Sequence, residues 1–235
     1  MSGGVGPSSD IKLPKEEEPG SLSHIQETIK PVPNCHFLTF RQLNAIVITI
    51  VFAASGMVSL EDFTFTFFSL FYVFFLSKVA FPASSLHTEQ VFGNSKLLPL
   101  YVWIGAFVGL LFPLVYIFEG ILEGDTEGIK AAAPHVFLLS SQIFMEGVTF
   151  SRQFSLPTRV FVPVFFNTKR LFTLSEWLRA EIAKVEGEHG SSRRLLVGRG
   201  LAVANLVFWS FNLFGFLLPV YLPRAFKRYY GKVKD

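Results

Sequence analysis

The stretch FTFTFFSLFYVFFLSKVAF, residues 63–81, decides the fold class of this chain. Phe and Thr alternate over its first five residues, as in a half-buried strand, but the apolar run is too long and lacks the turn signals of a sheet. As a helix it rises about 28 Å at about 1.5 Å per residue, close to the roughly 30 Å hydrocarbon core of a bilayer. It therefore predicts a transmembrane helix, with Glu61 and Asp62 at one end and Lys78 reaching past the other.

Composition extends this prediction to most of the chain. Charged residues make up 17 % of the sequence and apolar residues 50 %, whereas a soluble domain carries about 25 % charge. Apolar blocks of bilayer length also recur between short polar connections. We expect an all-α, polytopic transmembrane helix bundle within residues 37–222, with about five spans at residues 43–60, 63–81, 97–118, 133–150 and 200–222.

Both ends of the chain are expected to lie outside the bilayer. Residues 1–36 contain too few apolar groups to offset the entropy of ordering, which predicts a disordered cytosolic tail. The acidic residues 16–18 argue against a signal or transit peptide. Cys35 is a candidate for lipidation because it lies just before the first span. Residues 223–235 form a basic C-terminal tail, and the net charge of +3 suits anionic lipid rather than nucleic acid.

The segment between the fourth and fifth spans departs from the pattern. Residues 156–166 are apolar but include Arg159 and two prolines, and they are too short to cross, so we expect a re-entrant or interfacial turn. Residues 174–187 follow with a capping-box start and apolar residues on one face. This pattern predicts one interfacial amphipathic helix that lies flat on the membrane.

Lys and Arg near the span ends predict the orientation. The connection at residues 119–132 is acidic, whereas residues 152–199 include nine Lys or Arg. We therefore expect the second region and the N-terminus in the cytosol, and the first region on the opposite side. With five spans, the basic residues 223–235 then face away from the cytosol, against the rule. A crossing by residues 156–166 would give six spans and remove this conflict.

Polar residues of the fourth span share one helical face, since they follow one another at intervals of seven, four, three and four residues. They are His135, Gln142, Glu146, Thr149 and Gln153. Such a face avoids lipid. One hypothesis is that it packs against other helices; the alternative is a polar path with Glu146 as an ion or proton site.

Two further pairs of residues are candidates for helix packing. Asn205 and Asn212 are seven residues apart on the fifth span, where they are positioned to hydrogen-bond to the polar face of the fourth. Gly105 and Gly109 on the third span form a small-xxx-small pattern that lets helices approach closely.

Reactive groups for an enzyme are few. His87 and Glu89 are close in sequence, but no second histidine follows at the spacing of metal ligands. A nucleophile elbow, a phosphate loop and a dinucleotide fingerprint are all absent from the sequence. We therefore expect no enzymatic activity, no metal and no cofactor.

Several stretches carry a family resemblance: FLTFRQLNAI, FAASGMVSLEDF, SKVAFP and FNTKRLFTLSEWLRAE. Together they resemble an uncharacterised family of multi-pass membrane proteins of land plants, known only as a domain of unknown function, over about residues 36–235. The resemblance implies a plant source and a membrane location, and it supplies no site residues.

The sequence thus favours a non-enzymatic organiser or subunit in the endoplasmic reticulum or another endomembrane. Its partners would be the lipid bilayer and other membrane proteins, with no nucleic acid. The alternative is a small-solute or ion transporter that uses the polar face of the fourth span.

Overall fold

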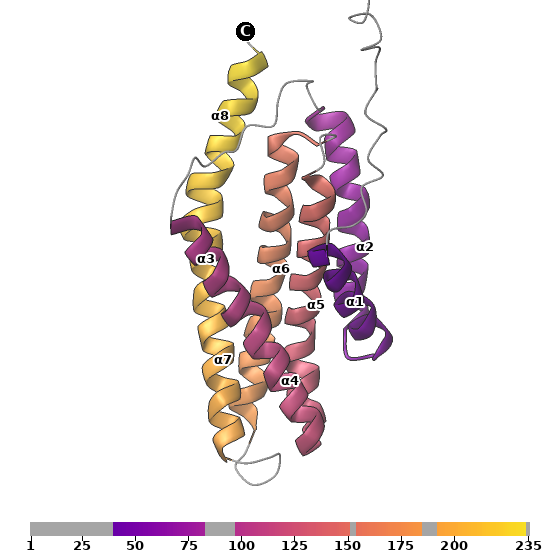
Figure 1. The fold of residues 1–235 in the computed structure, drawn as a ribbon, viewed down its shortest axis with the longest axis vertical. Helices are drawn as coiled ribbons and strands as arrows, with labels where there is room; N and C mark the ends of the chain where they lie inside the picture. The colour runs from indigo at the N-terminus through magenta and orange to yellow at the C-terminus, as the bar shows by residue number, and fades with distance from the viewer. Residues whose placement is uncertain (1–39, 83–96, 151–153, 185–191, 234–235) are drawn as a thin grey trace, which may run out of the picture. The chain divides into compact units, whose positions relative to one another are not determined.

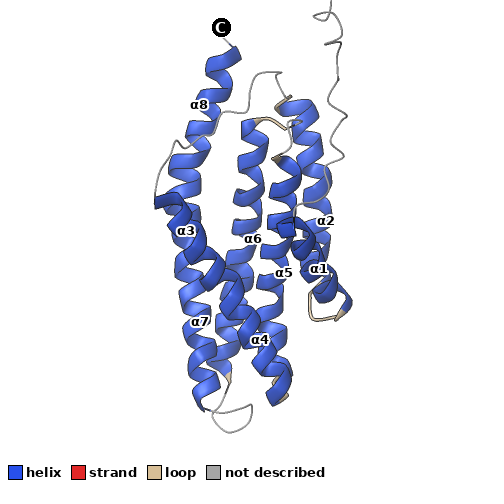
Figure 2. Cartoon of the chain, viewed as in Figure 1, coloured by secondary structure: helices blue, strands red, loops and turns tan. Residues whose placement is uncertain are grey.

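The computed structural model describes residues 40–82, 97–150, 154–184 and 192–233, all within one compact unit, Leu38–Asp235. In these ranges every regular element is a helix and no strand occurs (Figure 2), which confirms the expected all-α class. In chain order, with η for π-helical segments, the elements are α1 (Phe40–Ala54), α2 (Leu60–Phe75), η1 (Leu76–Ala80), α3 (Leu97–Ala106), η2 (Phe107–Leu111), α4 (Phe112–Glu123), α5 (Thr126–Thr149), α6 (Leu156–Ala183), α7 (Ser192–Ser210), η3 (Phe211–Tyr221) and α8 (Leu222–Val233).

The centre of the bundle is the pair α5 and α6, which pack along each other (Figure 1). Helices α1 and α4 cover α5, α7 and α8 cover α6, and α2 contacts both. Residues 135–142 of α5 are all buried, a run of more than two turns. Because consecutive residues point in all directions around a helix, α5 is enclosed by protein on every side over this stretch.

In the part of the chain that the structure describes, three helical stretches are long and apolar enough to cross a membrane: Leu60–Ala80, Pro99–Glu123 and Ser192–Gly231. Fewer helices than the five predicted spans are therefore long and apolar enough by themselves to cross. The first predicted span, residues 43–60, ends early as the short α1, because the chain turns at Gly56 with a φ of 68°. The fourth, residues 133–150, overlaps the second part of α5, where His135, Gln142 and Thr149 are buried by protein.

The structure also corrects the prediction for residues 156–187. They do not form a re-entrant turn followed by a separate flat helix, because Leu156–Ala183 is one continuous helix, α6. Pro157 lies in its first turn, where a missing N–H is harmless. Leu174 and Trp177, expected to face lipid, are fully buried against the bundle. This part of the apolar face that predicts an interfacial helix thus packs on protein, whereas Ile182 on the same face is exposed.

A tight turn joins α4 to α5 and positions the polar residues around it. Gly124 caps the end of α4 with a φ of 75°, in the left-handed region that glycine tolerates best. Asp125 follows as the N-cap of α5, where its Oδ1 accepts a hydrogen bond of 2.8 Å from the Gly128 N–H. The turn therefore fixes the Asp125 carboxylate at one end of the bundle.

Candidate functional site

The polar face predicted on the fourth span lies along α5, and its members have separate surroundings. His135 is fully buried and its Nε2 lies 2.8 Å from the carbonyl oxygen of Gly109, in the π-helical segment η2. Thr149 donates to the Glu146 carbonyl of its own helix, at 3.1 Å. Gln153 and Cys35 lie outside the residues that the structure describes.

The centre of this face is a hydrogen-bonded chain of three side chains, which we call the relay. Arg170 on α6 donates through Nη2 to Oε1 of Gln142 on α5. Gln142 in turn donates through Nε2 to Oε1 of Glu146, one turn further along α5, at 2.6 Å. The Gln142 amide thus lies between a cation and a carboxylate. Its oxygen accepts from Arg170 and its nitrogen donates to Glu146.

Arg170 is the most unusual member, because its side chain is 0 % exposed. Its guanidinium carbon lies 4.1 Å from the centre of the Trp209 ring on α7, a cation–π distance. A buried cation is strongly unfavourable unless an opposite charge and hydrogen bonds offset its lost hydration. The relay supplies part of this compensation, since Glu146 provides the opposite charge and Gln142 accepts from Nη2. Arg170 Nε and Nη1 have no hydrogen-bond partner among the described residues.

A pocket of about 560 Å³ opens beside the relay, between α1 and α3 and over α5 and α7. We call it the lateral pocket. Its polar lining comes from Asn44, Tyr101, Gln142 and Glu146, and the rest is apolar. The apolar lining is Ala45, Ile48, Val102, Trp103, Gly105, Ala106, Leu110, Leu139, Ile143, Phe208 and Trp209. Two of the three relay residues therefore face this space, whereas Arg170 lies behind them.

The polar face is therefore divided. Gln142 and Glu146 line the lateral pocket, but His135 and Thr149 do not belong to its lining. His135 is enclosed between η2 and the rings of Trp177 and Trp209. Of the four predicted positions that the structure describes, only Gln142 and Glu146 line this pocket.

The predicted packing residues Asn205 and Asn212 form hydrogen bonds with α7 and α3 rather than with α5. Asn205 donates to the Leu201 carbonyl on its own helix at 3.0 Å and accepts from Trp209 Nε1 at 3.2 Å. Asn212 accepts from the Tyr101 hydroxyl at 2.7 Å. The expected bonds from these asparagines to the fourth span are thus replaced by bonds within η3, α7 and α3.

Gly105 and Gly109 both lie against aromatic rings of α7. A Cβ atom on Gly109 would lie 2.7 Å from the Trp209 ring, and one on Gly105 would lie 3.2 Å from the Phe208 ring. The first distance is too short for any real Cβ contact. Gly109 therefore permits the approach of Trp209, which then stacks on Arg170.

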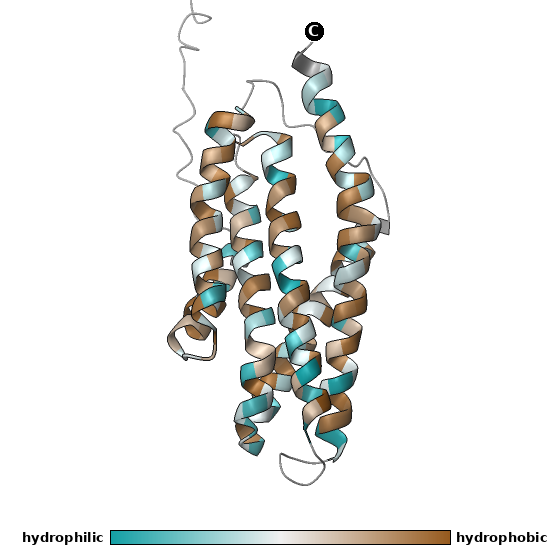
Figure 3. Ribbon diagram, turned by 180° about the vertical axis from the view of Figure 1, so that it is seen from behind, coloured by the Kyte–Doolittle hydropathy of each residue, from teal (hydrophilic) through white to brown (hydrophobic). Residues whose placement is uncertain are grey.

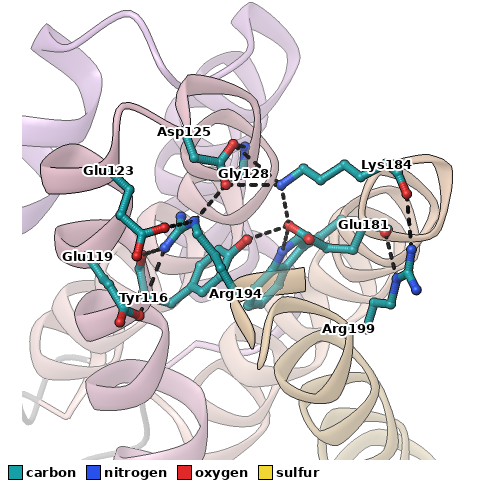
Figure 4. Close-up of polar contacts among 10 residues, drawn as sticks. Tyr116, Glu119, Glu123, Asp125, Gly128, Glu181, Lys184, Arg194 and Arg199 are labelled. Carbon is teal, nitrogen blue, oxygen red and sulfur yellow. Dashed lines mark hydrogen bonds and ion pairs between the residues drawn. The ribbon is translucent and has the colours of Figure 1, made fainter. Parts of the chain in front are cut away.

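A second polar cluster lies where α4, α5, α6 and α7 meet at one end of the bundle (Figure 4). We call it the end cluster. Asp125 accepts from Arg194 Nε at 2.8 Å and from Lys184 Nζ at 3.1 Å. Glu181 accepts from Lys184 Nζ at 3.1 Å and from the Tyr116 hydroxyl at 2.6 Å. The two carboxylates share Lys184. The ion pairs therefore join the turn between α4 and α5 to the end of α6 and, through Arg194, to α7.

Hydrogen-bond donors and cations around Asp125 determine the protonation of its carboxyl group. Its burial alone would raise the pKa of the carboxyl, but hydrogen bonds from the Gly128 N–H, Arg194 and Lys184 outweigh burial, so the pKa lies below its ordinary value. Asp125 is therefore ionised at neutral pH and serves as the counter-charge of Arg194 and Lys184.

The end cluster also corrects the predicted orientation. Residues 119–132 and residues 152–199 were expected on opposite sides of the membrane, yet Asp125 directly contacts Lys184 and Arg194. The reason is that α6 runs the length of the bundle and returns the chain to the end where α5 starts. The acidic connection and part of the basic region therefore neutralise each other.

Sequence reasoning overlooked the polar residues of α6. Asn167, Arg170, Trp177 and Glu181 are all buried. With Leu174 they follow intervals of three, four, three and four residues, which is the spacing of one helical face. That spacing was available in the sequence, but the prolines before it suggested an interruption that the structure does not have.

The family model described as a domain of unknown function, DUF7733, matches residues 38–230. No curated protein and no solved structure matches the chain. The match confirms the resemblance to an uncharacterised family, whereas the plant source stays a prediction.

Proposed function

Since the chain belongs to the DUF7733 family, whose function is unknown, we propose that it is an integral membrane protein with a non-enzymatic role as an organiser or subunit in an endomembrane. The observation that carries the proposal is the distribution of polar and apolar side chains between the interior and the outer surface of the bundle. The charged and amide groups of the relay and the end cluster lie between helices, while many large apolar side chains are exposed on the outer surface. Figure 3 shows this apolar character along the outer helices.

The clearest apolar surface is on α2. Phe63, Phe67, Phe71 and Phe75 recur every four residues, and each is about half exposed or more. A soluble monomer rarely exposes a continuous apolar patch of this kind. In a bilayer the same row contacts acyl chains or the helices of another membrane protein.

We further propose that α5 and α6 cross the membrane as helices enclosed by protein. Their neighbours supply the lipid-facing surface, so these two helices need not be as apolar as α2. The end cluster then lies on one side of the membrane. The opposite side contains the start of α6 and the end of α2, because Ser155 donates to the Phe81 carbonyl at 2.9 Å.

This topology places the start of α1 and the basic helix α8 on the same side. Gln42 of α1 lies against Gly147 near the end of α5, and Tyr229 of α8 donates to the Pro82 carbonyl at 3.2 Å. Six crossings, with α1 as a short one, satisfy this arrangement. Both ends would be cytosolic, in agreement with the exposed Arg224 and Lys227 on α8.

Crosslinking in membranes tests the role as an organiser. Full-length protein is crosslinked in cells or native membranes, and captured partners are compared between the wild type and Phe67→Leu/Phe71→Leu. Leucine is also apolar, so the variant keeps its contact with lipid but loses the aromatic rings that a partner helix would contact. Phe172→Leu, at another exposed position on α6, is the control. Partners lost only in the α2 variant would support the proposal, and a protein recovered alone under several mild detergents would contradict it.

A transporter is the second candidate, favoured by the carboxylate of Glu146 at the lateral pocket. Flux into vesicles containing the purified protein would support it, provided that Glu146→Gln abolishes the flux. The division of the polar face between the pocket and the enclosed His135 favours the organiser.

A further inference from the structure

We infer that the lateral pocket binds an amphiphile with one compact head group that donates hydrogen bonds, either a hydroxyl or an ammonium, and an apolar body. The inference rests on the proposed membrane location. It adds a ligand site that is independent of any protein partner.

The pocket has the size and lining of a small-molecule site. Its volume of about 560 Å³ is within the roughly 300–1,000 Å³ common for such sites. Aliphatic side chains and the rings of Trp103, Phe208 and Trp209 form most of its walls. This lining suits a hydrocarbon body and offers few partners to a polar one.

Two of the four polar residues of the lining are on α5, where Gln142 and Glu146 face the pocket one turn apart. The other two are Asn44 on α1 and Tyr101 on α3, whose hydroxyl donates to Asn212. A carboxylate can accept several hydrogen bonds at once, so Glu146 can accept from a ligand in addition to the Gln142 amide. Glu146 therefore offers acceptor capacity and negative charge to a ligand. Arg170 is held behind Gln142 and is not part of the lining, so a positive charge does not face the pocket from the relay.

This arrangement selects among head groups. A hydroxyl or an ammonium donates to the Glu146 carboxylate, and the ammonium also gains from the opposite charge. A carboxylate head brings a like charge against Glu146 and is disfavoured. A fatty acid is therefore the matched negative probe for an alcohol or an amine of similar apolar size.

The position of the pocket favours entry from the bilayer. Its α1 and α3 walls carry side chains that are exposed on the outer surface, among them Val102 and Trp103. A ligand already dissolved in lipid reaches such an opening without crossing water. The apolar body then stays in contact with acyl chains while the head reaches α5.

Photocrosslinking to the full-length protein in phosphatidylcholine vesicles tests the inference. Three clickable photoreactive probes are used: a sterol with a hydroxyl head, a long-chain sphingoid amine, and palmitic acid as the negative probe. We expect the sterol or the amine to label peptides that line the lateral pocket and palmitic acid to label them weakly. Glu146→Gln should reduce this labelling about tenfold, the loss expected for one hydrogen bond to a charged group.

Filling the pocket supplies the second variant. Ala106→Trp places an indole in the pocket and should abolish the labelling, whereas Val203→Trp, at an exposed site on α7 outside the lining, should not. Ile48→Trp fills the pocket from α1 if Ala106→Trp does not fold. Labelling that is unchanged by Glu146→Gln, or equal for all three probes and spread over the exposed helix faces, would overturn the inference. A protein that is washed from membranes by alkaline carbonate would instead overturn the proposed membrane location.

Discussion

Arg170 on α6 donates a hydrogen bond to Gln142 on α5, and the two side chains meet in the buried centre of the bundle. Through Gln142 the guanidinium is connected to Glu146, the carboxylate at the lateral pocket. A single contact between the two central helices therefore links the packing of the bundle to the polar end of its pocket.

Loss of the Arg170 side chain should strongly destabilise the protein. Arg170→Ala leaves Gln142 and Glu146 without their cation and opens space beside Trp209, so we expect a loss of about 3–5 kcal/mol in the free energy of unfolding. Arg179→Ala, at an exposed position on the same helix, is the control and should change it by less than about 0.5 kcal/mol. Thermal unfolding in detergent measures both. Equal melting temperatures for the two variants would show that the relay does not stabilise the bundle.

Two glycines of α7 should respond in opposite ways to alanine. A Cβ on Gly198 would lie 2.6 Å from Glu181 Oε2 and 2.8 Å from the Tyr116 hydroxyl, both fixed in the end cluster, whereas a Cβ on Gly200 meets nothing within 4 Å. Gly198→Ala should destabilise by about 1–3 kcal/mol. Gly200→Ala should stabilise by up to about 1 kcal/mol, because alanine favours a helix. A stabilising Gly198→Ala would mean that the end cluster is looser than described.

Stability should fall in acid through Asp125. Its pKa is lower in the folded protein than its ordinary value of 3.8. Its contribution is therefore complete above pH 3.8 and disappears as the pH falls toward the lower pKa of the folded state. Melting temperatures of the wild type and Asp125→Asn should differ at neutral pH and converge below about pH 4. A difference that stays constant across this range would exclude ionisation of Asp125 as its cause.

The two ends of the bundle should be accessible from opposite sides of the membrane. A glycosylation sequon appended after Asp235 should remain unmodified, because α8 is proposed to extend into the cytosol. A protease added to sealed microsomes should remove an epitope tag at the same place. Glycosylation of the appended sequon would instead place the tail in the lumen and contradict six crossings.

The sequence predicted some helices better than others, and the environment of each helix explains the difference. Helix α2 has a long apolar surface that faces outward, so hydropathy alone identified it. Helices α5 and α6 are covered by other helices, and a residue such as Arg170 is acceptable there only because Gln142 and Trp209 are adjacent in space. No local pattern reveals such neighbours, which come from a distant part of the chain.

The need for neighbours from distant parts of the chain also explains which parts of the candidate site the sequence could predict. Gln142 and Glu146 could be selected from the spacing of polar residues on α5. The lateral pocket depends on how α1, α3 and α7 surround that face, and a spacing within one helix does not contain this information. Asp125, Lys184 and Arg194 are likewise far apart in sequence and adjacent only because α6 returns to the start of α5.

Alkaline carbonate extraction of membranes that contain the full-length protein tests the central claim most directly. Outward-facing apolar helices should keep the protein in the membrane pellet, where only detergent releases it. Recovery of the protein in the carbonate supernatant, folded and monodisperse without detergent, would contradict the proposal that these helices lie in the bilayer.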